Sequence, residues 1–140
     1  MSQIAHIEFH DARVAGISVM PSGIVRVEFK HICVYFKVEE EFCEVWSARA
    51  VLQLEDVNRI EFRGAFQTDD YISEGSLFDE TGTEITAELT VDQVGLAKRL
   101  VLLFAGSGSE ALFSMRTARF VLEELLAKLE DWKGPLSSQS

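Results

Sequence analysis

The chain has 140 residues, a mass of 15.7 kDa and a formal net charge of −10 at pH 7. This length is typical of one domain with a continuous core, and a hydrophobic fraction of 47% excludes a disordered chain. The negative charge argues against a nucleic-acid partner, because a polyanion is repelled by a surface of its own sign.

The negative charge is concentrated in the central part of the sequence. Residues 39–92 contain 15 Asp and Glu and three Arg, a net charge of −12, whereas residues 1–38 and 93–140 each carry +1. A localised field of one sign attracts a partner of the opposite sign. The central residues are therefore candidates for a surface that binds a basic protein.

The remaining composition predicts a reduced, cytoplasmic protein that holds no cofactor. Cys33 and Cys43 are too few and too poorly spaced for a disulfide scaffold or a zinc site, so we expect both thiols to be reduced and buried. Residues 1–8 lack the basic and apolar segments of a signal peptide. No apolar run approaches the ~18 residues of a membrane-spanning helix, so no membrane association is expected.

Apolar residues alternate with a period of two over the first two thirds of the chain, which predicts half-buried strands. In the second strand the inward set changes parity between Phe29 and Ile32, and this predicts a bulge or a sharp bend near His31. A turn at residues 21–23 suits a hairpin between the first two strands. The expected strands lie at residues 14–20, 24–38, 46–54, 60–64, 85–91, 100–104 and 111–115.

Two segments break this alternation. Residues 67–84 are polar and rich in turn-forming residues, so we expect a loop. From about Thr117 the apolar residues recur at helical spacing, which predicts an amphipathic helix over 117–133 that Gly134 and Pro135 end. The predicted fold is mostly β (α+β), an antiparallel sandwich or partial barrel with one C-terminal helix. It forms a single domain over residues 1–134, with a disordered tail at 135–140.

The string Phe9-His10-Asp11 is the most distinctive local motif. Asp11 suits a turn in which its carboxylate accepts backbone hydrogen bonds, and His10 suits a bond to a carbonyl or carboxylate, so a structural role is favoured. His6, Glu8 and His10 would share one face of a strand and resemble metal ligands, but we expect no metal there. No catalytic group is predicted, since Cys33 and His31 would lie about 7 Å apart on a strand, too far for a reactive pair.

An acidic binding surface is the principal site hypothesis. Its carboxylates would steer and orient a basic partner, with Tyr71, Phe42 and Phe78 as apolar anchors. Simple solubility is the competing explanation of the same charge. The predicted partner-binding residues are Glu39, Glu40, Glu41, Glu44, Asp69, Asp70, Tyr71, Glu74, Asp79 and Glu80.

Residues Ile7 to Val19, IEFHDARVAGISV, resemble the opening of a group of small bacterial proteins that begin with Phe-His-Asp-Ser/Ala followed by a strand. Some members of that group are classed as immunity proteins of polymorphic toxin systems. The resemblance implies a protein without enzymatic activity that neutralises a toxin by binding it. The helix predicted at the C-terminus departs from the all-strand ending of this group.

Three functions follow as hypotheses. The first is a protein-binding module, such as an immunity-type inhibitor, that docks a basic partner. The second is a β-barrel domain that binds a small ligand or is an enzyme, with Trp46, His31 and Arg49 lining a pocket. The third is a self-associating structural protein, a homodimer whose seam is the Leu and Trp stripe at 122–132.

Overall fold

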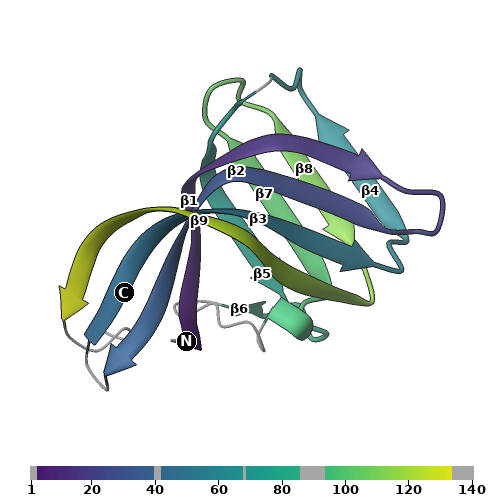
Figure 1. The fold of residues 1–140 in the computed structure, drawn as a ribbon. Helices are drawn as coiled ribbons and strands as arrows, with labels where there is room; N and C mark the ends of the chain where they lie inside the picture. The colour runs from purple at the N-terminus through teal and green to yellow at the C-terminus, as the bar shows by residue number, and fades with distance from the viewer. Residues whose placement is uncertain (1–2, 40–41, 68, 86–93, 134–140) are drawn as a thin grey trace.

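The computed structural model describes residues 3–39, 42–67, 69–85 and 94–133, which form nine strands in two antiparallel sheets (Figure 1). The first sheet has the strand order β1-β2-β3-β9. Its strands are long: β1 (Gln3–Val19), β2 (Val25–Glu39), β3 (Phe42–Glu55) and β9 (Thr117–Lys133). The second sheet has the order β4-β8-β7-β5-β6, from β4 (Arg59–Arg63), β5 (Ile72–Phe78), β6 (Glu84–Ile85), β7 (Arg99–Phe104) and β8 (Glu110–Ser114).

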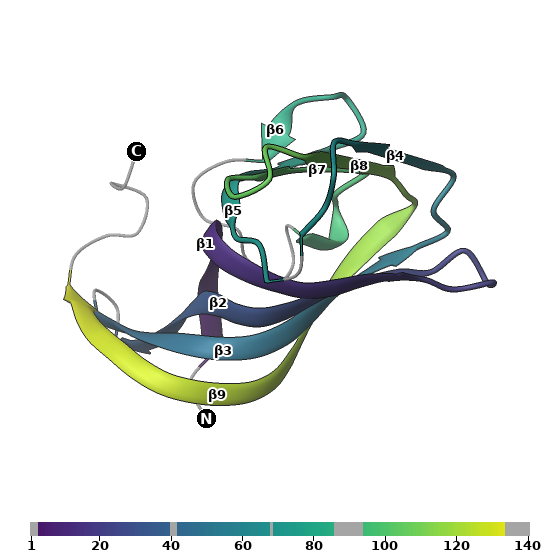
Figure 2. The same cartoon turned by 90° about the horizontal axis from the view of Figure 1, so that it is seen from above.

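The two sheets pack face to face over one continuous core. In Figure 2 the first sheet forms the lower layer, and the ends of β2, β3 and β9 extend beyond the second sheet. The alternation of apolar residues decides which face is buried, since Val25, Val27 and Phe29 all point into the core. Phe29 of the first sheet and Phe113 of the second are almost fully buried in this core, and burying each ring contributes about 1.5–3 kcal/mol.

The strands of the first sheet bend sharply halfway along their length. The pairing of β2 with β3 shifts between Phe29 and Ile32, so the bulge predicted near His31 is confirmed. The pairing of β1 with β2 shifts at the same level, between Glu8 and Arg13. A bulge adds one residue to one strand and bends it, and aligned bulges therefore turn the whole sheet away from its partner layer.

Most of the predicted strands are confirmed, but β1 begins at Gln3 and not at residue 14, and two other segments differ. The expected loop over 67–84 contains strand β5, which pairs with β7 through residues such as Leu77 and Leu100. Leu77 is buried there, so one polar turn-rich stretch still supplies a core residue. The strand expected over 85–91 is described only as far as Ile85, and the tail expected at 135–140 lies outside the described residues.

The prediction of a C-terminal helix is wrong, because residues 117–133 form strand β9. This strand pairs with β3 from Glu55↔Thr117 to Phe42↔Lys133. Each of three register shifts adds one residue to β9, so Leu122 pairs with Ala50 and Leu125 with Ala48, both inward positions on β3. Because of the added residues, leucines three positions apart in β9 lie opposite inward residues of β3, and their spacing imitates the period of a helix.

Candidate functional site

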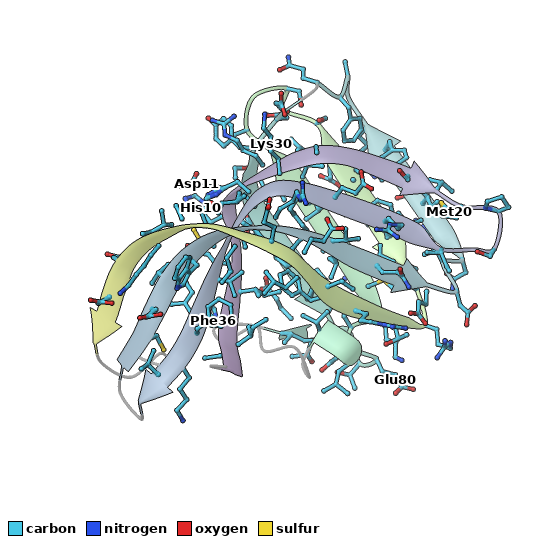
Figure 3. The ribbon with its side chains drawn as sticks, viewed as in Figure 1. His10, Asp11, Met20, Lys30, Phe36 and Glu80 are labelled. Atoms are coloured by element: carbon cyan, nitrogen blue, oxygen red, sulfur yellow. The ribbon has the colours of Figure 1, made fainter. Side chains whose placement is uncertain are left out.

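The structure separates the predicted acidic residues instead of gathering them into one patch. Asp69 and Asp70 precede strand β5, whereas Asp79 and Glu80 follow its other end. Figure 3 shows the same separation, with Glu80 far from Lys30, which binds Asp69 at 3.4 Å. Glu44 lies on β3, in the other sheet, and Glu40 and Glu41 lie outside the described residues.

Two of these carboxylates, those of Asp70 and Asp79, accept hydrogen bonds from neighbouring turns and therefore have a structural role. Asp70 is 6% exposed and accepts four hydrogen bonds, from the backbone N–H groups of Tyr71, Gly106 and Ser107 and from the Ser107 hydroxyl. Burial raises the pKa of Asp70, but these hydrogen bonds outweigh it and the net pKa is lowered. Asp70 therefore fastens the start of β5 to the turn between β7 and β8.

Asp79 plays a comparable part in the turn between β5 and β6. Its Oδ1 atom accepts hydrogen bonds from the Thr81 N–H at 2.9 Å, the Thr83 N–H at 3.0 Å and the Thr81 hydroxyl at 2.7 Å. The hydrogen bond from the Thr81 side chain, followed by that from the Thr83 backbone, lowers the pKa of Asp79. A side chain that closes its own turn is a poor candidate for the centre of an interface.

The Phe9-His10-Asp11 motif joins the first sheet to the second. The Phe9 ring is stacked on Phe29 with centroids 6.0 Å apart and fills the space beside Gly75 of β5. His10 Nδ1 lies 2.8 Å from the Ser73 carbonyl oxygen, and Asp11 adopts a positive φ of 65° within the bulge of β1. Few residue types tolerate this conformation, and Asp is among them.

The histidines and cysteines do not assemble a metal site or a reactive dyad. His6 packs edge-on against Tyr35, whose hydroxyl donates to Glu8 at 3.0 Å, and the described residues contain no group of three metal-ligating side chains. His31 hydrogen-bonds to the Ser47 hydroxyl at the bend, not to Cys33. Cys33 is half-buried and Cys43 is buried, and burial raises the pKa of the Cys33 thiol.

An open groove of about 300 Å³ lies on the part of the first sheet that extends beyond the second. We call it the acidic groove, and its residues come from β2, β3 and β9: Phe36, Glu44, Trp46, Leu122, Glu123, Glu124 and Leu125. Trp46 and Leu122 pack against the core, so the floor of the groove is fixed. Three carboxylates accompany these apolar side chains.

The carboxylates around the acidic groove outnumber the cations that bind them. Lys128 lies 3.2 Å from Glu44 and 2.8 Å from Asp131, and Arg49 lies 4.0 Å from Glu123 and 3.7 Å from Glu124. These ion pairs are substantially exposed, and such pairs contribute only about 0–1 kcal/mol. Breaking them therefore costs little free energy.

Sequence reasoning found Glu44 and Trp46 but missed the contribution of β9. The predicted helix over 117–133 has Leu122 on its apolar face and Glu123 and Glu124 off that face. Ala118, Phe120 and the half-buried Leu122 alternate with exposed Arg119, Val121 and Glu123, and this short alternation is the one local signal for a strand.

The described residues include no helix long and apolar enough to cross a membrane. Comparison of the chain with protein-family models, with curated proteins and with solved structures finds no match.

Proposed function

We propose that this chain is a protein-binding module without enzymatic activity, and that the acidic groove receives a basic segment of its partner. The observation that carries the proposal is the combination of a fixed apolar floor with three carboxylates in one groove. Apolar anchors bury area at the centre of an interface, and surrounding charges set the orientation and the association rate.

Trp46 gives the groove a second means of binding a cation. Its indole N–H donates to Glu44 Oε1 at 3.3 Å, which holds the ring beside a carboxylate. An arginine side chain placed there would stack on the indole and pair with Glu44 at the same time. A basic segment with interspersed apolar residues therefore matches the groove better than a purely ionic one.

The sequence resemblance proposes a class for the partner. Immunity proteins of polymorphic toxin systems bind toxins, and a nuclease toxin presents a basic cleft that normally receives phosphate groups. Strand β9 also supplies the all-strand ending expected of that group. We therefore propose a toxin with a basic surface as the natural partner, encoded next to this chain.

The proposal is tested by removing the charges without changing their shape. The triple variant Glu44→Gln, Glu123→Gln, Glu124→Gln is titrated by calorimetry with a synthetic peptide of alternating Arg and Leu. A matched control, Glu74→Gln, Glu80→Gln, Glu84→Gln, removes the same total charge from exposed positions on β5, on β6 and in the turn between them. We expect at least tenfold weaker binding for the groove variant, a change below twofold for the control, and steep weakening with salt.

Equal weakening in both triple variants would mean that net charge alone attracts the peptide and would refute the groove. Self-association is the competing outcome, since Leu125, Leu126 and Leu129 of β9 are 42–51% exposed on an edge strand. It would appear as concentration-dependent sedimentation that a Leu126→Lys variant abolishes.

A further inference from the structure

A second hollow, of about 320 Å³, lies where strands β1 and β4 form the margins of their sheets. It is separate from the acidic groove and shares no residue with it. Strand β1, strand β4, the following loop and the end of β7 all contribute to its wall. The lining residues are Val14, Ala15, Gly16, Ile17, Phe62, Phe66, Gln67 and Phe104.

The wall of this hollow is aromatic. The Phe66 ring lies edge-on between Phe62 and Phe104, with centroid distances of 5.1 and 5.3 Å. Phe62 is 48% exposed and Phe66 is 41% exposed, so two large rings leave much of their surface in water beside the same hollow. An aromatic ligand would continue the edge-to-face arrangement and cover this surface.

The opposite wall leaves room because its residues are small. The pairing of β1 with β2 shifts between Val14 and Gly16, and this bulge presents Ala15 and Gly16 at the margin of the sheet. A Cβ atom on Gly16 would meet nothing closer than Glu28 Oε2 at 3.9 Å. The margin formed by Ala15 and Gly16 therefore carries no large side chain of its own.

The lining also decides the charge and size of a ligand. Among the described residues that line the hollow none is ionisable and Gln67 alone has a polar side chain, so an ion would lose hydration without compensation. An apolar cavity of about 150 Å³ accommodates benzene, and this hollow is about twice that size. We propose that it binds a neutral two-ring aromatic molecule of the size of indole, whose polar group meets Gln67.

Indole is the probe that tests this assignment. Titration into ¹³C-methyl-labelled protein should give saturable shifts at Val14 and Ile17, with little change at Leu122 or Leu125 in the acidic groove. Ala15→Leu places a side chain at the margin of the hollow and should weaken indole binding at least tenfold, as should Phe66→Ala. Ala65→Leu adds the same apolar surface outside the lining and should leave binding within twofold.

Indole-3-carboxylate provides the charge control and should bind at least tenfold more weakly than indole. Shifts that never saturate, or an Ala15→Leu protein that unfolds as wild type does yet binds indole equally well, would overturn the proposal. So would sedimentation showing that Phe62 and Phe66 join two copies of the chain, because the hollow would then be a protein interface.

Discussion

Asp70 offers the sharpest test of how two connections within the second sheet are held together. Replacing it with Ala removes the acceptor of four hydrogen bonds, and replacing it with Asn keeps one carbonyl oxygen but turns an N–H group toward the Ser107 N–H. The adjacent Asp69 is the matched control. It is exposed, forms one ion pair with Lys30, and has a positive φ of 59°, which Asn also tolerates.

The expected cost follows from the burial and the bond count. A hydrogen bond to a charged group contributes about 1.5–3 kcal/mol, but water can replace part of this at the exposed Gly106 and Tyr71. We expect the free energy of unfolding to fall by about 3 kcal/mol for Asp70→Ala and about 2 kcal/mol for Asp70→Asn. Asp69→Asn should cost less than about 1 kcal/mol. The Ala variant should lower Tm by on the order of 10 °C.

Urea unfolding at pH 7, 5 and 3 measures these costs and their pH dependence. The pKa of Asp70 is lowered in the folded state, so its stabilisation is present above the ordinary Asp pKa and is lost as the pH falls through the lowered value. The difference between wild type and Asp70→Asn should therefore shrink in acid. An Asp70→Asn protein as stable as wild type at pH 7, or a difference that does not change with pH, would refute this account.

Two further predictions concern the junction between β1 and β5. Gly75→Ala places a Cβ 2.7 Å from Phe9 Cβ and should lower the free energy of unfolding, measured in urea, by about 1–3 kcal/mol. In the control Gly95→Ala the new Cβ meets no atom within 4 Å, so the free energy of unfolding should not change. Equal effects of the two substitutions would contradict the packing of Phe9 on Gly75. The pKa of His10, measured by NMR, should lie above 6.5 because the Ser73 carbonyl and then the Asp11 carboxylate favour its protonated form. Asp11→Asn should lower that pKa and cost more stability at pH 5 than at pH 8, and an unchanged His10 pKa would argue against the contact.

The sequence by itself determined the strands whose alternation is uninterrupted. In β2 and in residues 46–54 of β3 each inward residue is apolar, and a change of parity between Phe29 and Ile32 was enough to locate the bend. This works because the side-chain period of a strand is two, so a single added residue is visible as a change of face. The hairpin of β7 and β8 was predictable for the same reason.

Only the tertiary structure decided the state of residues 117–133. Their leucines have a helical spacing, yet these residues pair with β3 along its whole length and accommodate three added residues. Pairing with β3 outweighs local propensity, because the backbone hydrogen bonds form while Ala118, Phe120 and Leu122 pack against the core.

The positions of the carboxylates in space could likewise not be predicted from the sequence. Proximity along the chain grouped Asp69, Asp79 and Glu44, but β5 places the first two at opposite ends and the third lies in the other sheet. Glu44 is a neighbour of Trp46 on β3, but the other two glutamates of the acidic groove, Glu123 and Glu124, come from β9, far away in the sequence. Charge composition is fixed by the residues, whereas a charged surface is made by long-range strand pairing, which the composition does not record.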